Sequence, residues 1–377
     1  MAGIYIHIPF CKQKCHYCNF FSAATTRWKA PFILALLKEM ELRRTYLDGE
    51  TVKTIYFGGG TPSLLQIGEL KKILDHIFRH FSVDPEAEIT LEANPDDISE
   101  SIAREWKGTH VNRLSIGVQS FFDDDLHYLN RVHNSSQVFH AIDNARKAGF
   151  NNLTIDLIYG IPTLSDQKWI NNLEYFLALD IPHLSAYSLT VEQKTPLDLL
   201  IRKGKYKKVD EQQSIGHFKI LLEYARKNGF IHYEISNFAR EGYYSRHNSL
   251  YWLGGHYLGL GPSAHSYNGH SRQWNVSNIT KYIQLDDFHT IMEEKEILTR
   301  NQRYNEYVMT SLRTIWGCDT THILNVFGSD YQSGFIKNAQ KYLEKNHLYC
   351  EGNRYYLTDE GKLFADGIAA GLFREEE

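Results

Sequence analysis

Three cysteines within eight residues are the strongest chemical signal in the sequence. They are Cys11, Cys15 and Cys18, whereas the two remaining cysteines, Cys318 and Cys350, lie far away. Thiolates clustered this closely usually hold a metal ion or an iron–sulfur cluster. A four-iron cluster normally takes four cysteines. No fourth cysteine follows the group here, so three ligands would leave one iron open to bind a substrate.

Two other interpretations compete with a cluster. In the first, His7 or His16 joins the cysteines as the fourth ligand of a structural zinc ion, although zinc sites favour Cys-x2-Cys pairs over the Cys-x3-Cys-x2-Cys spacing found here. In the second, the cysteines form disulfides, which the odd number of clustered cysteines and the long, cysteine-poor chain disfavour. The downstream sequence decides between the three.

Composition narrows the class of protein. The chain has 377 residues, a net charge of −4 and 42% hydrophobic residues, which is enough to bury one large core or two modest ones. The near-neutral net charge does not indicate nucleic-acid binding, and no apolar run approaches the ~20 residues of a membrane span. The first residues lack the basic leader of a signal peptide. Few cysteines and no export signal predict a cytoplasmic protein.

Short apolar segments alternate with longer amphipathic ones. Six strands separated by helices are expected, over 3–8, 52–57, 88–93, 113–118, 153–158 and 183–189. Such spacing predicts a parallel sheet, which binds ligands at the carboxyl ends of its strands. The cysteine loop follows the first strand and a Gly-Gly-Gly-Thr-Pro run, 58–62, follows the second. One common site at that edge is therefore expected.

The residue pattern of the sequence changes after the sixth strand. A Gly- and aromatic-rich segment is followed by helices and a terminal hairpin, over 302–316, 335–345 and 347–358. This order predicts a small winged-helix-like domain, and the charge favours a packing role over DNA binding. The predicted division is a core barrel over 1–235, a connecting region over 236–293 and a C-terminal helical domain over 294–377.

The segment from Tyr5 to Ser22 resembles the start of radical S-adenosylmethionine (SAM) proteins. Within that superfamily, nearly the whole chain is similar to the group that contains the anaerobic coproporphyrinogen III oxidases (HemN) and the heme chaperones (HemW). The resemblance implies an α/β fold, namely an open three-quarter (βα)6 barrel with a small HemN-type C-terminal domain. It also implies a [4Fe-4S] cluster on Cys11, Cys15 and Cys18, with SAM bound beside it.

The resemblance further implies which residues contact SAM: Tyr5, Tyr17, Gly59, Gly60, Thr61, Glu92, Gln119, Arg131 and Asp156. The glycines let the backbone approach the methionyl ammonium. Arg131 would pair with the SAM carboxylate, a bidentate task suited to guanidinium. Glu92, Gln119 and Asp156 would hold ribose hydroxyls, with the ammonium as an alternative partner for Glu92 and Arg131 for Asp156. Each polar residue alone is more often a satisfied surface or capping group; the joint match favours the site.

Three features favour the chaperones within this group. The HemN pattern carries a fourth cysteine where this chain has Phe20, and Cys11 lies too near the N-terminus to leave room for the segment that precedes it in HemN. The sequence His247-Asn-Ser-Leu-Tyr251-Trp252 matches the His-Asn-x-x-Tyr-Trp motif of heme chaperones.

His247 is therefore the predicted heme ligand, since a neutral imidazole is a standard axial ligand of heme iron. Arg240 and Arg246 lie close in sequence and would pair with the heme propionates. The alternative is that His247 merely tethers its loop by hydrogen bonds. His256 and His265 are rival ligands.

These features predict a cytoplasmic heme chaperone that works at the membrane face. Its cofactors would be the [4Fe-4S] cluster and SAM, its cargo heme, and its partners apo-hemoproteins of the respiratory membrane and an electron donor for the cluster. The alternative is an enzyme, an oxygen-independent coproporphyrinogen III oxidase in which a 5′-deoxyadenosyl radical abstracts hydrogen from a propionate. A zinc-stabilised structural protein remains only if the cluster is absent.

Overall fold

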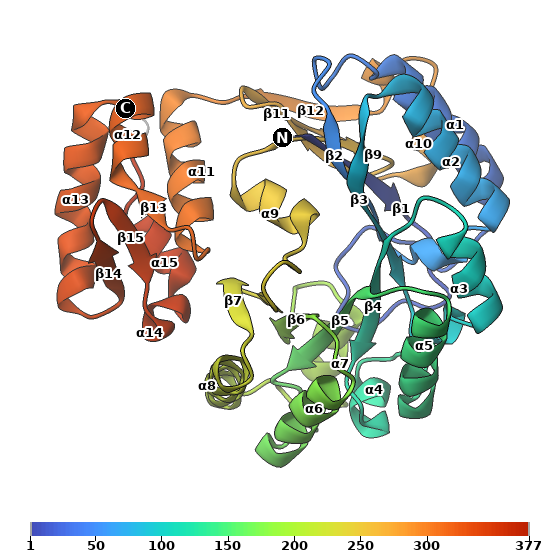
Figure 1. Cartoon of the computed structure of the whole chain (residues 1–377), viewed down its shortest axis with the longest axis horizontal. Helices are drawn as coiled ribbons and strands as arrows, with labels where there is room; N and C mark the ends of the chain where they lie inside the picture. Colours follow the sequence, from blue (N-terminus) through green and yellow to red (C-terminus); the bar gives the residue numbers. More distant parts are fainter. Residues whose placement is uncertain (1, 376–377) are drawn as a thin grey trace.

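A single curved sheet of 12 strands forms the centre of the molecule, in the order β12-β11-β10-β9-β1-β2-β3-β4-β5-β6-β8-β7 (Figure 1). The computed structural model describes residues 2–375. Within them, strand pairing ends at β12 on one side and at β7 on the other, so the sheet stays open. The predicted α/β fold with an open parallel sheet is confirmed.

The six predicted strands are present and run parallel: β1 (Ala2–Ile8), β2 (Val52–Gly59), β3 (Val83–Ala93), β4 (Arg113–Gln119), β5 (Asn152–Tyr159) and β6 (His183–Ser188). Helices connect them along the outside: α1 (Lys29–Leu42), α2 (Ile67–His80), α3 (Glu100–Lys107), α4 (Asp123–Tyr128), α5 (Ser135–Lys147) and α6 (Asp166–Ala178). Two 3-10 turns, η1 (Pro62–Leu64) and η2 (Pro95–Asp97), follow β2 and β3, and α7 (Pro196–Arg202) and α8 (Glu211–Lys227) follow β6.

Helix α2 illustrates why these segments are helical. Its buried residues include Leu70, Ile73, Leu74 and Ile77, which share one face at helical spacing. A capping box between Gln66 and Glu69 satisfies its first backbone donors.

The strands alternate between apolar and polar positions. On β3, Ile89 and Leu91 are buried apolar residues, whereas Glu88, Thr90 and Glu92 occupy the positions between them. Side chains alternate across a strand, so one face of the curved sheet packs against the helices and the other lines the interior with polar groups. The interior is thus equipped for polar ligands along its length.

The segment that was predicted only as Gly- and aromatic-rich extends both edges of the sheet. On one edge, β7 (Ile231–Glu234) and β8 (Asn237–Ala239) pair beside β6; on the other, β9 (His256–Leu260) pairs with β1 in parallel. The remaining elements are α9 (Arg246–Trp252), β10 (His265–Tyr267), β11 (Ser271–Asn275), α10 (Ile279–Tyr282), η3 (Phe288–Thr290) and β12 (Met292–Ile297). The domain boundary predicted at residue 235 falls inside the β7–β8 hairpin.

The C-terminal domain has its own hydrophobic core and lies on the far side of α9 from the parallel strands (Figure 1). Its helices are α11 (Arg300–Leu312), α12 (Thr320–Phe327), α13 (Ser329–Glu344), α14 (Asp359–Lys362) and α15 (Ala365–Ala370). Its small sheet has the order β13-β15-β14 and is formed by β13 (Cys318–Asp319), β14 (Leu348–Glu351) and β15 (Arg354–Leu357). None of the described helices is long and apolar enough to cross a bilayer.

A buried ion pair on α1 fastens the connecting region to the barrel. Glu39 is 0% exposed and accepts hydrogen bonds from Arg43 (3.1 Å), Asn275 (2.8 Å) and Tyr282 (2.6 Å). The Arg43 guanidinium also donates to the carbonyl of Gly259 at 2.8 Å. One carboxylate and one guanidinium thus join α1 to β9, β11 and α10.

Replacing Glu39 tests this clamp. Glu39→Ala leaves the Arg43 charge buried without its carboxylate, so the free energy of unfolding should fall by about 3–5 kcal/mol. Urea denaturation followed by circular dichroism measures the change. Glu100→Ala breaks an exposed pair with Arg104 and should cost less than ~1 kcal/mol. If Glu39→Ala is as mild as this control, the clamp does not stabilise the fold.

Candidate functional site

A cavity of about 150 Å³ lies at the carboxyl ends of the central strands. Of the residues predicted to hold the cluster and SAM, all but Tyr5 line it: Cys11, Cys15, Tyr17, Cys18, Gly59, Gly60, Thr61, Glu92, Gln119, Arg131 and Asp156. They come from the ends of β2, β3, β4 and β5 and from the loops that follow β1 and α4. Residues 145 positions apart in the sequence, from Cys11 to Asp156, therefore meet in one place.

Backbone hydrogen bonds hold the cysteine loop against its neighbours. The N–H of Cys11 donates to the carbonyl of Ala23 at 3.1 Å, and that of His16 donates to the carbonyl of Leu129 at 3.1 Å. All three thiols are free and half-buried. Burial raises the pKa of the Cys11 and Cys18 thiols, so binding of a metal group must release their protons.

The histidines considered as zinc ligands have other partners. His7 Nδ1 accepts a hydrogen bond from the Tyr5 hydroxyl (3.1 Å), and its Nε2 donates to the carbonyl of Phe21 (2.8 Å). His16 Nδ1 lies 3.2 Å from the carbonyl oxygen of Tyr128. The hydrogen-bond donors that line the cavity next to the thiols are instead the Arg131 guanidinium and backbone groups. Such donors suit a cluster bound by sulfur, with a ligand beside it.

The glycine run is required by close packing of its loop on β1. A Cβ on Gly60 would lie 2.7 Å from the carbonyl oxygens of Ile8 and Phe10, and one on Gly59 would lie 2.5 Å from the His7 ring. Gly59 also has a φ of +104°, which favours glycine. The loop backbone is thereby held at the cavity wall, where it can approach a ligand closely.

Arg131 lines the cavity as a cation, together with the more exposed Lys14. Its Nη2 donates to Asn94 Oδ1 (2.7 Å) and to the carbonyl of Gly117 (2.8 Å), and its Nη1 lies 3.4 Å from Cys15 Sγ. These acceptors are an amide, a carbonyl and a thiol, and the buried Nε has no hydrogen-bond partner. A guanidinium in such surroundings retains the capacity to bind an anion, and a carboxylate fits its geometry.

Two buried carboxyl groups face the same space. Burial raises the pKa of Glu92 to about 7, although the Tyr56 hydroxyl donates a hydrogen bond to Glu92 Oε1 at 2.8 Å and opposes the shift. Burial likewise raises the pKa of Asp156 to about 6 against a hydrogen bond from Ser185. A bound cation favours the charged forms, so the pair is suited to an ammonium or sulfonium group.

Gln119 occupies an unusual backbone position. Its φ is +69°, in the left-handed region, and the pairing of β4 with β5 is irregular between Ile116 and Gln119. Such outliers cluster at ligand sites, where the surrounding structure holds them. The sequence analysis missed other lining residues, among them Asn94, Ser115 and Gly117; Ser115 follows the polar alternation of β4 and could have been found from it.

His247 lies outside the cavity, in a stack of rings. It is 1% exposed; its Nδ1 lies 2.8 Å from Thr54 Oγ1 and its Nε2 lies 2.8 Å from the Tyr251 hydroxyl. Its ring stacks on Tyr56 at 5.0 Å and on Tyr5 at 6.4 Å, and burial lowers its pKa to about 3. The imidazole is thus neutral, as ligation requires, but both nitrogens are engaged.

The other residues considered for heme also have partners elsewhere. Arg240 pairs with Asp180 (2.7 Å), and the Arg246 guanidinium donates to the carbonyl of Glu86 (2.8 Å). The remaining two are histidines with partners of their own: His256 pairs with Glu50 and His265 stacks on Trp274.

A second and larger cleft, of about 600 Å³, is lined by residues of α9, the edge strands and the C-terminal domain. Aromatic residues form its walls: Tyr251, Trp252, Tyr257, Tyr267, Tyr307, Trp316 and Phe327. Arg272, Arg303 and Arg354 also line it. The sequence analysis missed this cleft because its walls come from separate segments, and only Tyr251-Trp252 carried a motif.

Comparison with known proteins identifies the family. The radical SAM superfamily signature matches residues 5–176. The chain is 34% identical to the heme chaperone HemW of Bacillus subtilis (strain 168), over 100% of both chains. It is 36% identical to HemW of Synechocystis sp. (strain PCC 6803), over 99% of this chain and 96% of that one. The chain belongs to the HemW family of radical SAM proteins.

The predicted resemblance to the HemW group is therefore confirmed. The solved structure of coproporphyrinogen III oxidase (HemN) from Escherichia coli shares the fold of this HemW-family chain, with a TM-score of 0.85 over 99% of this chain and 90% of that one. The sequence identity is 22%, so this likeness establishes the fold alone.

The raised pKa of Glu92 predicts a pH-dependent effect on stability. The folded state binds the proton more tightly than the unfolded chain does, so the stability contributed by Glu92 is present below pH ~4.5 and is lost as the pH rises to about 7. Glu92→Gln removes the free-energy cost of burying an ionised carboxylate. It should raise the free energy of unfolding by ~1–3 kcal/mol at pH 8 and change it little at pH 5.

Urea denaturation at both pH values measures this difference, and Glu86→Gln, at an exposed position on the same strand, serves as the control. An equal effect of Glu92→Gln at pH 5 and pH 8 would show that the Glu92 carboxyl is not destabilised by burial.

Proposed function

We propose that this chain is a heme chaperone, in which the three-cysteine cavity binds a [4Fe-4S] cluster and SAM and the aromatic cleft receives heme. Full-length relatives named heme chaperones support this assignment. The observation that carries it is the position of the His247-to-Trp252 motif. It forms α9, whose Tyr251 and Trp252 line the cleft while His247 lies directly behind Tyr251.

The residues of the first cavity fit a cluster with SAM. Cys11, Cys15 and Cys18 supply three thiolates, which is the donor set for a cluster with one open iron. A cluster held there would offer one open iron for SAM to chelate and, when reduced, an electron for its cleavage. Arg131 binds the SAM carboxylate with its unused donor, and the nearby cluster sulfurs share its charge.

The two carboxyl groups and the loop orient the rest of SAM. Glu92 and Asp156 hold the ammonium and the ribose hydroxyls, and Gly59, Gly60 and Thr61 present their backbone to the methionyl end. Tyr17 closes the cavity beside the cysteines. Tyr5 acts indirectly, because its hydroxyl holds His7, which packs under Gly59.

The cleft matches the shape and charge of heme. Its volume of about 600 Å³ lies within the range of small-molecule sites, and aromatic walls suit a flat macrocycle. Arg272 and Arg303 each hold a buried Nε without a hydrogen-bond partner, and Arg272 pairs with Glu306. Guanidinium groups at one apolar cleft are suited to two propionates.

Tyr251 controls access to His247. Its hydroxyl is the partner of His247 Nε2, and its ring is part of the cleft wall. When Tyr251 turns away, Nε2 faces the cleft and ligates heme iron. His322 is the rival ligand, because it lines the cleft, is exposed, and lies 4.2 Å from the Tyr307 ring, centroid to centroid.

The chaperone delivers heme to apo-hemoproteins, including those at the membrane, and takes electrons for the cluster from a reductase partner. The second candidate function is oxidation of coproporphyrinogen III, which the HemN-like fold supports. Against it, the position of the fourth cysteine in the HemN pattern is taken by Phe20, which is 63% exposed at the mouth of the cavity.

Anaerobic heme titration of cluster-loaded protein tests this proposal. Wild type should bind one heme, and His247→Ala should lose the wild-type Soret spectrum while it keeps the cluster. Tyr251→Phe, which frees Nε2, should bind heme faster than wild type. Arg303→Gln should weaken heme binding roughly ten- to a hundredfold, as the loss of a charge-assisted contact does, whereas Arg104→Gln on the exposed surface should not.

Two results would contradict parts of the proposal. A wild-type spectrum in His247→Ala together with its loss in His322→Ala would transfer ligation to His322. No heme binding by wild type, together with turnover of coproporphyrinogen III to protoporphyrinogen IX with SAM and a reductant, would establish the oxidase instead.

A further inference from the structure

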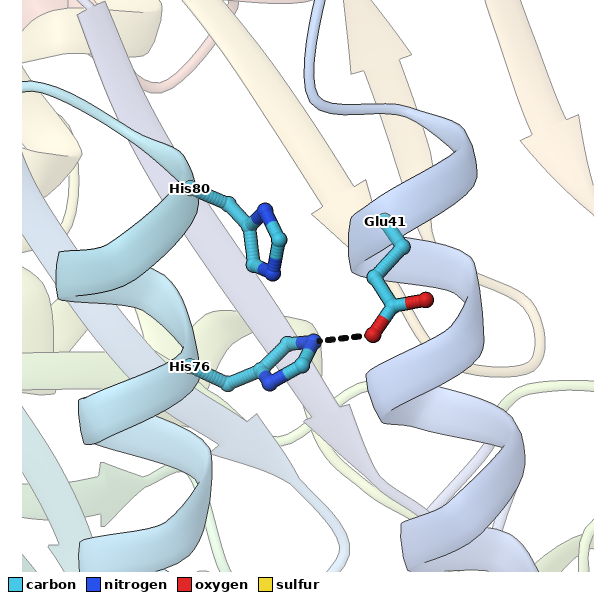
Figure 2. A group of neighbouring side chains, drawn as sticks. All are labelled: Glu41, His76 and His80. Carbon is cyan, nitrogen blue, oxygen red and sulfur yellow. Dashed lines mark ion pairs between the residues drawn. The ribbon is translucent and has the colours of Figure 1, made fainter.

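A second cluster of metal-ligand side chains lies on the outer helices, away from both cavities. Glu41 on α1 and His76 and His80 on α2 point toward one another (Figure 2), and one ligand atom from each lies within 4.8 Å of the others. In the described part of the chain, this is the one group of three His, Cys, Asp or Glu that meets this distance. His76 and His80 are four residues apart, so one helix presents both rings on one face.

The contact between His76 and Glu41 lacks an aligned hydrogen bond, and a cation would stabilise it. His76 Nε2 lies 3.2 Å from Glu41 Oε1, yet this nitrogen is buried without an aligned hydrogen bond. Nε2 therefore lacks a hydrogen-bond partner and faces a carboxylate oxygen.

A ring nitrogen and a carboxylate oxygen at this distance can share one cation, and the His80 ring lies beside them, 4.5 Å from the His76 ring, centroid to centroid. Only 9% of His76 is exposed, whereas the Glu41 side chain is 52% exposed, so a cation could enter from the Glu41 side.

We propose that Glu41, His76 and His80 bind a divalent transition-metal ion of the zinc class. Tetrahedral zinc with bonds of about 2.0–2.2 Å to nitrogen and oxygen places two ligand atoms about 3.4 Å apart, close to the 3.2 Å between His76 and Glu41. Two imidazoles and one carboxylate select zinc-like ions over calcium or magnesium, which take oxygen ligands.

The helix ends favour the same cation. Glu41 lies in the last turn of α1, and His76 and His80 lie in the last two turns of α2. The carboxyl end of a helix carries partial negative charge, so a cation there is stabilised by both helices. In a parallel sheet of strand–helix units these helix ends are at the amino ends of the strands, opposite the cysteine cavity. The metal therefore fastens α1 to α2 and takes no part in chemistry at the cluster.

Zinc titration by calorimetry tests this site on cluster-loaded protein, in which the cluster occupies Cys11, Cys15 and Cys18. Wild type should bind one Zn²⁺ per chain, and saturating Zn²⁺ should raise its thermal midpoint. His80→Ala and Glu41→Gln should each weaken Zn²⁺ binding at least tenfold and abolish the thermal shift. Both residues are at least partly exposed, so these variants keep the fold even if His76→Ala does not.

His110→Ala, which removes an exposed histidine outside the group, is the matched control and should bind Zn²⁺ as wild type does. Wild-type stoichiometry and affinity in both His80→Ala and Glu41→Gln would overturn the proposal. So would a wild-type protein that binds no Zn²⁺ or shows no thermal shift. Neither outcome bears on heme binding, so this proposal and the chaperone function fail separately.

Discussion

The site depends on one buried positive charge, that of Arg131. Its guanidinium contacts the cysteine loop through Cys15, the end of β3 through Asn94 and the end of β4 through Gly117. These segments are far apart in the sequence and meet only at the carboxyl edge of the sheet. Because Asn94 and Gly117 offer only neutral acceptors, Arg131 keeps charge available to an anion in the cavity.

The carboxyl groups of Glu92 and Asp156 supply the negative charge of the site. Burial raises the pKa of Glu92 to about 7 and that of Asp156 to about 6. A zwitterionic ligand with a carboxylate near Arg131 and a cationic group near Glu92 compensates the buried charges of both residues at once. The two binding regions differ in character: the barrel cavity is polar and charged, whereas the cleft beside α9 is lined by aromatic residues and arginines.

Much of the barrel could be predicted from the sequence. Periodicity located the six parallel strands, and placing the cysteine loop, the glycine run and Asp156 at strand ends brought them to one edge. Tyr5 was predicted to flank the cluster, but its direct contacts are with His7, Tyr56 and His247. Tyr5 and Asp156 lie equally far from the ends of their strands, but only Asp156 lines the cavity, and periodicity alone does not give that difference.

The connecting region could not be predicted because its order comes from partners elsewhere. Strands β9 to β12 are short and carry many polar residues; β9 is positioned by pairing with β1, and the region is held by the Glu39–Arg43 clamp. The cleft needs the C-terminal domain as its second wall. Local patterns carry no record of such long-range contacts.

The account rests most directly on SAM binding beside the cluster through Arg131. Calorimetric titration of SAM into anaerobically reconstituted, cluster-loaded protein should give one site in wild type and in Cys318→Ala. Arg131→Ala should retain the cluster and bind SAM roughly ten- to a hundredfold more weakly, and Cys15→Ala should lose both. Unchanged SAM affinity in cluster-loaded Arg131→Ala would contradict the account.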